Sequence, residues 1–485
     1  MEWRIFLKQC YVVLGVSLNL AQFGLVIGFS ALLLPQLKKP DSAIPIDNAT
    51  GSWIASMPAL SLMIGNIIVA PIMGKFGRKF ANTISIAIVT IGWLCVVLAT
   101  NVAILLTARF LQGISLGMAL SLSPVLIAEY SSPRWRGAFL TSLSLIMSLA
   151  TLFVHTITAY ITWKSAALVC TAITAFNLVM VLPSPESPSW LASQGRYDRC
   201  RRVFQWLRGS GEEDELNKLI EADRAAKKQI VTNKTAANKQ NTSFTSVITK
   251  KEFYKPIFVA AHMYIVGLIC GVNILSAYTV DILDGVTKPD VNIPLVIISL
   301  DVQRFITNCI AVLIIKKLKR RTVFFASGFC NIIATFLLAL YIFMRSKSLM
   351  PFDHSMVGVL LVHFHIFSAI IGAFPVPLIV CGELFSMKYR SISSGITSLF
   401  LSIGLFVVMK TFPILNNSIG LGGGYLLYGA ILCYSILIAW FYLPETKDKT
   451  LQEIEEELLG RKLVEDPQSA QSLMNQQRND EEICK

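Results

Sequence analysis

The sequence predicts an all-α membrane protein in which twelve transmembrane helices form two six-helix halves. Three observations favour this fold class. Hydrophobic residues make up 54% of the chain and charged residues only 15%, whereas soluble globular proteins carry about 25% charged residues. The apolar residues form long runs without charge, which are typical of membrane spans. Basic residues gather in alternate short loops between these runs, and charged motifs recur in both halves of the chain.

The first half of the chain contains six apolar runs that are long enough to cross a bilayer. They cover residues 9–34, 52–73, 81–99, 102–128, 138–162 and 166–182. A short segment, residues 1–8, precedes the first run, and a basic turn at residues 74–79 separates the second run from the third. We therefore expect residues 9–182 to form the N-terminal six-helix bundle.

A long polar segment, residues 183–256, divides the chain into two apolar blocks of similar size. Residues 212–229 are rich in charged residues that favour helices, and residues 233–243 are rich in Asn, Thr and Lys, which is typical of a flexible linker. The segment is therefore predicted to form short cytoplasmic helices followed by a flexible connection to the second block.

The second half of the chain repeats the pattern of the first. Its apolar runs cover residues 257–278, 292–315, 322–344, 356–381, 392–414 and 422–443. A basic turn at residues 316–321 follows the second of these runs, and a polar tail at residues 444–485 follows the last. We expect residues 257–443 to form the C-terminal six-helix bundle and the tail to be cytoplasmic.

The distribution of Lys and Arg predicts the orientation of the chain in a cell membrane. Basic residues are concentrated in residues 75–79, 134–136, 183–256, 316–321 and 388–390. Because basic loops stay on the cytoplasmic side, both termini and the central segment are predicted to be cytoplasmic. The sequons at Asn48 and Asn416 then lie outside as candidate glycosylation sites, whereas those at Asn233 and Asn241 lie inside.

Charged residues recur at matching positions in the two halves. Glu129 is followed by Arg136, and Glu383 is followed at the same spacing by Arg390. A basic turn precedes the third span of each half. Such a duplication is typical of alternating-access transporters, whose halves rock about a central site. We interpret six charged residues as candidate gate residues that latch the halves together; the alternative is that they only enforce topology. They are Arg78, Glu129, Arg136, Arg320, Glu383 and Arg390.

Several short motifs give the chain a family resemblance over about residues 10–455. They are Gly77-Arg78-Lys79, Arg109-Phe110-Leu111-Gln112-Gly113, Pro185-Glu186-Ser187-Pro188-Ser189-Trp190-Leu191, Gly271-Val272-Asn273, Pro375-Val376-Pro377, Glu383-Leu384-Phe385 and Pro444-Glu445-Thr446. With these motifs the chain resembles the sugar porters of the major facilitator superfamily, and among them the insect facilitated trehalose transporters. The resemblance implies the major-facilitator fold, a sugar such as trehalose or a hexose as substrate, facilitated diffusion and no cofactor.

The resemblance also identifies candidate substrate-binding residues and several departures from the family pattern. It implies roles in sugar binding for Asn273, Tyr278 and Ser144, although Ser144 stands where the family has Gln. Other polar positions of the family pattern are occupied here by residues that lack a polar side chain. They are Gly267, Leu268, Leu378, Leu401 and Leu405. Since each buried unpaired hydroxyl costs about 1–3 kcal/mol, these losses put binding of an ordinary hexose or trehalose in question.

The run at residues 292–315 carries an unusual polar face. Asp301, Arg304 and Asn308 fall on one side of a helix with 3.6 residues per turn, and Arg304 aligns with a sugar-binding Asn of the family. A charge at that depth faces a partner or a water-filled cavity and is a candidate functional group. We therefore interpret all three as substrate-binding candidates; the alternative is an Asp301–Arg304 pair that only stabilises the packing of helices.

The run at residues 102–128 carries one buried cation and two glycines. Arg109 lies inside the apolar run, so it must find a carboxylate, a carbonyl or water. Gly113 and Gly117 are four residues apart, a spacing that allows close helix packing.

Other functional classes find little support in the sequence. Basic residues follow the loops rather than forming a nucleic-acid patch, and no Walker motif or catalytic arrangement of nucleophile and base occurs. His363 and His365 are two residues apart and point to different faces of a helix, so metal binding is not expected. Two alternatives to facilitated diffusion remain: a proton-coupled porter that uses Asp301 and moves a different solute, such as an anion, and a non-transporting nutrient sensor on the same scaffold.

Overall fold

The computed structural model describes the chain in nine segments. They are residues 2–209, 211–221, 223–224, 250–289, 291–349, 354–385, 389–447, 449 and 451–459. The secondary structure of these segments is helical, as the composition predicts. Eleven of their helices are long and apolar enough to cross a membrane. The expected count of twelve is consistent with this, because the last two runs form one helix of 53 residues that is broken at Gly420.

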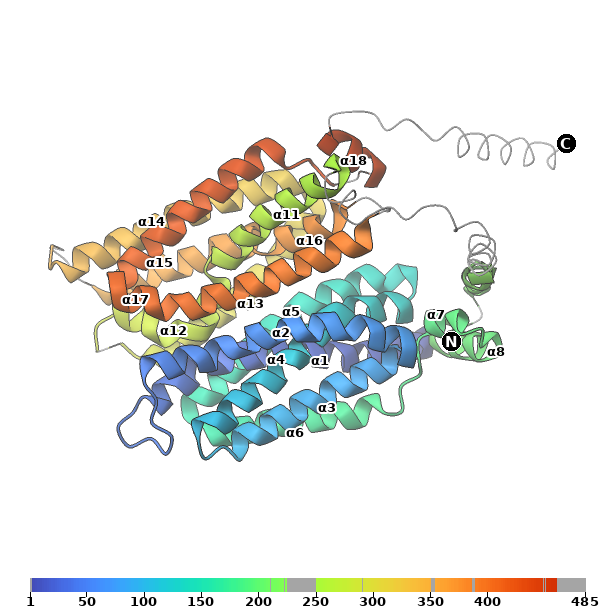
Figure 1. Cartoon of the computed structure of the whole chain (residues 1–485), viewed down its shortest axis with the longest axis horizontal. Coiled ribbons are helices and arrows are strands. Elements are labelled where there is room, and N and C mark those ends of the chain that lie inside the picture. Colours follow the sequence, from blue (N-terminus) through green and yellow to red (C-terminus); the bar gives the residue numbers. More distant parts are fainter. Residues whose placement is uncertain are drawn as a thin grey trace.

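The six apolar runs of the N-terminal half form six helices that pack together on one side of the molecule (Figure 1). They are α1 (Glu2–Leu37), α2 (Asn48–Phe76), α3 (Arg78–Val97), α4 (Val102–Tyr130), α5 (Pro133–Tyr160) and α6 (Trp163–Val181). Each helix contains the corresponding predicted run almost completely.

Polar side chains in the short loops start several of these helices. Asp47 accepts a hydrogen bond from the Thr50 amide at 2.9 Å at the start of α2. Asn101 accepts one from the Ile104 amide at 3.0 Å at the start of α4. Asp and Asn are favoured at this position because their oxygens satisfy amides that have no partner within the helix.

Small residues bring α2 and α4 into backbone contact. A Cβ atom on Gly117 would lie 2.1 Å from the carbonyl oxygen of Leu62, and one on Gly65 would lie 2.1 Å from that of Ile114. A Cβ atom on Gly113 would also meet α2, at 2.2 Å from a backbone oxygen. The packing role expected for Gly113 and Gly117 is therefore confirmed.

The central segment folds against one end of the N-terminal half. It forms α7 (Pro188–Ser193), α8 (Tyr197–Arg208) and a helical stretch at residues 213–221. These share a small apolar core that includes Trp190, Phe204 and Leu216, and burial there raises the pKa of Cys200 to about 11. The helix expected at residues 212–229 is thus present as far as residue 221, while the expected linker lies outside the described residues.

The C-terminal half also contains the expected runs, but several are interrupted. Its elements are α11 (Lys251–Ile269), α12 (Val272–Val286), α13 (Ile293–Lys317), α14 (Arg320–Ser346), α15 (Ser355–Ser368), η1 (Ala369–Ala373), α16 (Pro375–Glu383), α17 (Arg390–Tyr442) and α18 (Leu451–Leu459). Gly271, at a φ of 100°, separates α11 from α12, a conformation that suits glycine. The π-helical turn η1 ends just before Pro375, which cannot donate a backbone hydrogen bond to the preceding turn.

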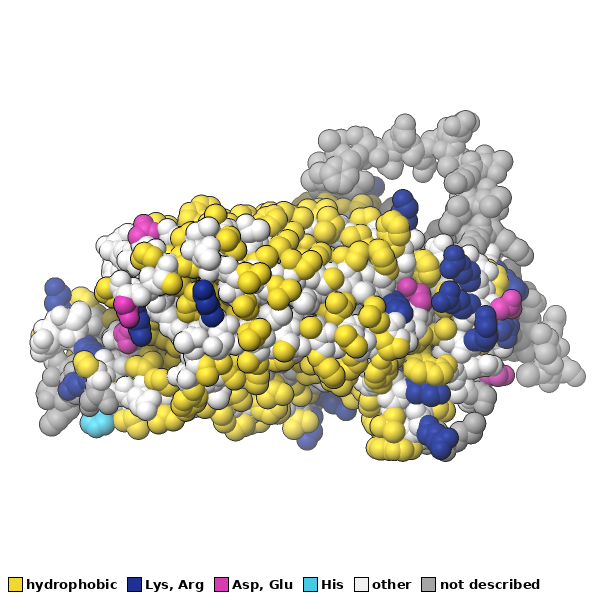
Figure 2. Space-filling model, turned by 90° about the horizontal axis from the view of Figure 1, so that it is seen from below, with side chains coloured by type: hydrophobic (Ala, Val, Ile, Leu, Met, Phe, Trp, Pro, Cys, Tyr) yellow, Lys and Arg dark blue, Asp and Glu magenta, His cyan; other side chains and the backbone are white. Residues whose placement is uncertain are grey.

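Apolar side chains form a broad belt around the molecule. Figure 2 shows this belt across the middle of one face, with Lys and Arg gathered toward the end that carries α7 and α8 in Figure 1. We call this the basic end; it includes the turns at residues 75–79 and 316–321. Large apolar side chains such as Phe176, Leu360 and Phe441 are 64–72% exposed, which suits a hydrocarbon environment rather than water.

Candidate functional site

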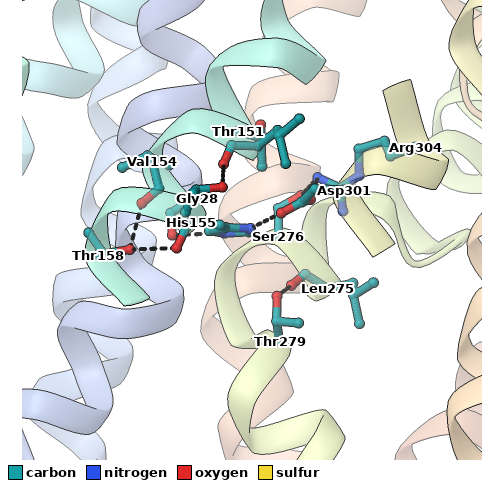
Figure 3. Close-up of polar contacts among 12 residues, drawn as sticks. Gly28, Thr151, Val154, His155, Thr158, Leu275, Ser276, Thr279, Asp301 and Arg304 are labelled. Atoms are coloured by element: carbon teal, nitrogen blue, oxygen red, sulfur yellow. Dashed lines mark hydrogen bonds and ion pairs between the residues drawn. The ribbon is translucent and has the colours of Figure 1, made fainter. Parts of the chain in front are cut away.

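A row of polar side chains crosses the contact between the two halves inside the apolar belt. Asp301, Arg304 and Asn308 of α13 are 1%, 5% and 8% exposed, so the shared face predicted for them is buried. It lies against α5 of the N-terminal half and α12 of its own half. Figure 3 shows His155 reaching from α5 toward Asp301, with Arg304 beyond it.

Arg304 is held by two neighbours. Its terminal nitrogen lies 3.6 Å from Asp301 Oδ1 and donates a hydrogen bond to Ser276 Oγ of α12 at 2.8 Å. The pair with Asp301 that the sequence left as an alternative is therefore formed. The Nε atom of Arg304 is buried and has no hydrogen-bond partner among the described residues, so the guanidinium keeps a free donor at Nε.

His155 is the member of this row that the sequence analysis missed. Its Nδ1 lies 2.5 Å from Asp301 Oδ2, and its Nε2 lies 3.1 Å from the carbonyl oxygen of Gly28 on α1. Gly28 permits this approach, because a Cβ atom there would lie 2.9 Å from Val154 Cγ1 and 3.1 Å from His155 Nε2. A lone histidine in the apolar run at residues 138–162 was the available signal, but its carboxylate partner is 146 positions away in the chain.

Asn308 joins the halves one turn further along α13. Its amide nitrogen donates to the carbonyl oxygen of Ser144 at 3.0 Å and to the hydroxyl of Ser148 at 2.9 Å. The hydroxyl of Ser144 donates to Thr141 of its own helix at 3.1 Å. The structure therefore brings Ser144 and Asn308 together, but through the serine backbone rather than its side chain.

The two candidate residues on α12 lie near the breaks in that helix. Asn273 is buried just after Gly271. Tyr278 has non-helical backbone angles, and its hydroxyl donates to the carbonyl oxygen of Met409 on α17 at 2.8 Å. The ring of Tyr278 also packs against Phe412, with ring centroids 5.0 Å apart. Tyr278 therefore ties a kink in α12 to α17.

Arg109 is fully buried and is held by oxygen atoms of the N-terminal half. It donates to the carbonyl oxygens of Val26 at 2.9 Å and Ile54 at 3.2 Å, to Gln112 Oε1 at 3.0 Å and to Ser30 Oγ. The sequence predicted that Arg109 finds a carboxylate, a carbonyl or water, and the structure confirms that it binds carbonyl oxygens. Arg109 thereby joins α1, α2 and α4.

At the basic end, the charged residues of the N-terminal half form a compact cluster. Arg78 Nε lies 3.4 Å from Glu129 Oε2, and the same carboxylate accepts a hydrogen bond from the Ser187 hydroxyl. Glu186 accepts from the amides of Arg78 and Lys79 at 2.9 Å. Glu186 thus caps the start of α3, where a carboxylate is favoured by free amides and by the helix dipole.

The C-terminal half repeats this cluster. Arg320 lies 2.7 Å from Glu383 and 3.4 Å from the Thr446 hydroxyl. Glu445 accepts from the amides of Arg320 and Arg321 at 3.1 Å, at the start of α14. Glu186 and Glu445 therefore do the same thing in the two halves: each caps the helix that follows the basic turn of its half. This shared role explains why a Pro-Glu motif follows the last span of each half.

In this structure the described candidate gate residues form pairs within one half or with the central segment. Arg78 and Glu129 both belong to the N-terminal half, and Arg320 and Glu383 both belong to the C-terminal half. Arg136 lies 3.5 Å from Glu215 of the central segment. The side chain of Arg390 lies outside the described residues. In this structure the charges therefore stabilise each half and its attached segment.

At the opposite end, other contacts join the halves, and the sequence did not reveal them. Lys38 lies 3.8 Å from Asp281. Lys410 of α17 lies 3.9 Å from the ring centroid of Trp53 on α2, and its carbonyl oxygen accepts from Ser52 at 3.2 Å. The halves are thus in contact at this end and along the row of polar residues in the belt.

Comparison with known proteins gives consistent matches over nearly the whole chain. A family model described as "Sugar (and other) transporter" matches residues 12–458. The chain is 28% identical to facilitated trehalose transporters Tret1 of Aedes aegypti and Culex quinquefasciatus, covering 93% and 94% of this chain. It spans 55% of the length of the first and 86% of the second, and about half the length of several other curated relatives it matches.

Solved structures share the fold at lower identity. The inward-open xylose transporter XylE of E. coli superposes with a TM-score of 0.74 at 18% identity, over 93% of this chain and 99% of that one. The proton:xylose symporter XylE bound to 6-bromo-6-deoxy-D-glucose gives a TM-score of 0.73 at 18% identity, over 94% and 99%. This likeness shows the fold that the sequence predicts.

Proposed function

Because this multi-pass membrane protein belongs to the sugar (and other) transporter family, we propose that it moves a small sugar across the cell membrane by alternating access. The observation that carries the proposal is the row of polar groups where the halves meet inside the apolar belt. Hydroxyl-rich solutes need hydrogen-bond partners from the protein when they leave water. The row supplies donors and acceptors from both halves, so a bound sugar would bridge the surfaces that move.

Individual residues have complementary roles in this proposal. The free Nε of Arg304 offers a donor inside the belt. Asn308 and Ser148 bond to each other across the halves and would exchange that bond for sugar hydroxyls when the halves part. Asn273 and Tyr278 would contribute from α12, and Ser144 would contribute its backbone. Asp301 would hold Arg304 in place.

The direction of insertion follows from the basic end. Lys and Arg gather there, so we propose that it faces the cytoplasm together with both termini. Asn48 is exposed at the opposite end, at the start of α2, which supports it as an external glycosylation site. Asn416 is half-buried within α17, and the same orientation puts it outside.

Reconstitution into liposomes tests the function directly. We expect uptake of labelled trehalose or glucose above that of protein-free liposomes. Asn308→Leu should reduce uptake strongly, because it removes the amide that faces α5. Glu221→Gln, at an exposed position of the central segment, is the matched control and should not. Binding of sugar without uptake would instead favour the sensor interpretation, and neither binding nor uptake of any sugar would contradict the proposal.

A further inference from the structure

Both ring nitrogens of His155 contact atoms that accept hydrogen bonds. Nε2 faces the carbonyl oxygen of Gly28 at 3.1 Å, and Nδ1 faces Asp301 Oδ2 at 2.5 Å. A carbonyl can only accept, and an ionised carboxylate can only accept, whereas a neutral imidazole has a single N–H. The two contacts are satisfied together only if the ring is doubly protonated or if Asp301 carries a proton that it donates to Nδ1.

Either arrangement contains one proton more than a neutral imidazole beside a carboxylate. We propose that His155 and Asp301 together bind one proton, and that this shared proton locks α5 of the N-terminal half to α13 of the C-terminal half. The proton site lies inside the apolar belt, since both residues are 1% exposed. It requires both halves, because each contributes one of the two groups.

The groups around the pair are one cation, one hydroxyl and one carbonyl. Arg304 of α13 lies 3.6 Å from the other carboxylate oxygen, Oδ1. From α12 the neighbour is the neutral Ser276, and from α1 it is the Gly28 carbonyl. Arg109 of α4 bonds to α1 at Val26 and Ser30 rather than to this pair.

Separation of the halves would change the affinity for this proton. Arg304 is three residues from Asp301 on the same helix and would stay with it, whereas His155 would leave with α5. An imidazole without a carboxylate partner is largely neutral above about pH 7, so the proton would be released as the contact opens. Acid should therefore stabilise the closed contact, and rising pH should weaken it.

The inference rests on the proposed function only in assuming that the halves separate during the cycle. It can be tested by conformation alone, without sugar. Spin labels at Lys39→Cys and Lys347→Cys, exposed positions at the opposite end, report opening there in a background without native cysteines. With one linked proton, the ratio of open to closed molecules should rise above about pH 6.5, where a free imidazole becomes neutral, by up to tenfold per pH unit.

Two substitutions remove the proton site and one is a matched control. His155→Gln and Asp301→Asn should each abolish most of the pH dependence. His363→Gln should preserve it, because His363 contacts Gln303 and Ser299 on another side of α13. A pH-independent distance in the unmodified transporter, or an unchanged pH response in a folded His155→Gln protein, would overturn the inference. Sugar uptake without any pH response rejects the proton lock alone, and a pH response without sugar uptake rejects the sugar proposal alone.

Discussion

The guanidinium of Arg304 lies in the apolar belt, where an unpaired cation costs about 3 kcal/mol even on a lenient insertion scale. Asp301 and Ser276 account for one of its nitrogen atoms, and the buried Nε has no partner among the described residues. A structural ion pair explains the first contact, and the buried Nε remains available to a ligand. A sugar hydroxyl or an anionic group at this position would satisfy it.

We therefore expect Arg304→Asn to alter selectivity as well as stability. The change removes the cation from Asp301 Oδ1 and leaves only His155 on Oδ2, so thermal stability should fall. Adding Asp301→Asn should restore part of it, since the two substitutions remove both members of the Asp301–Arg304 pair but also the carboxylate that His155 contacts. Uptake of a neutral sugar relative to an anionic analogue should increase in both variants. If the double variant regains stability and its selectivity is unchanged, Arg304 has only a structural role.

The sequence predicted individual residues correctly where the evidence lay within one helix. Helical periodicity placed Asp301, Arg304 and Asn308 on one face, and burial of Arg109 required oxygen partners that the structure supplies. His155 was missed because its importance depends on the packing of α5 against α13, which hydropathy does not encode. The carboxyl caps at Glu186 and Glu445 were visible only as a repeated motif, because their partners begin helices about 110 to 125 positions away.

At the scale of helices, hydropathy predicted the positions of the spans but not their interruptions. Long apolar runs are sufficient to identify spans because the bilayer requires them. The breaks at Gly271, at Gly420 and around Pro375 depend on backbone conformations that the runs do not reveal. The kink of α12 at Tyr278 was not visible in the hydropathy either, because it is accompanied by a hydrogen bond from the tyrosine hydroxyl to Met409 on α17.

The close contact between α2 and α4 predicts that alanine is tolerated less well at Gly117 than at Gly137, which lies outside this contact. In Gly117→Ala the new methyl group would meet the Leu62 oxygen at 2.1 Å, so the helices must separate and stability should fall by about 1–3 kcal/mol. In Gly137→Ala on α5 nothing lies within 4 Å of the new atom, and stability should rise by about 0.5–1 kcal/mol. Thermal unfolding in detergent compares the two; equal effects would contradict the proposed helix contact.

For the whole molecule, the basic end predicts the topology. Tags placed before Glu2, in the central segment and after the C-terminal tail should all be protected from external reagents in intact cells. A tag in the loop at residues 38–47, at the opposite end, should be accessible and serves as the control. Exposure of any of the first three tags would contradict the orientation derived from Lys and Arg.

The duplicated clusters at the basic end predict how the two halves contribute to transport. Because Arg78–Glu129 and Arg320–Glu383 each lie within one half, each should keep its own half rigid while the halves rock about the central site. Glu129→Gln and Glu383→Gln should therefore slow uptake but leave the protein folded, since these ion pairs are partly exposed and contribute about 1 kcal/mol or less.

The double variant distinguishes rigid halves from a latch between them. If each carboxylate acts within its own half, the effects of the two substitutions on the activation free energy should add, because the sites are distant and independent. The fold-reduction in uptake rate of the double variant should then equal the product of the two single fold-reductions. If the two clusters also meet across the halves in another state of the cycle, the double variant should be no slower than the slower single one. Rates for Glu129→Gln, Glu383→Gln, both together and the Glu221→Gln control decide between these outcomes. Unchanged rates in all variants would contradict both roles and leave the charges as topology signals.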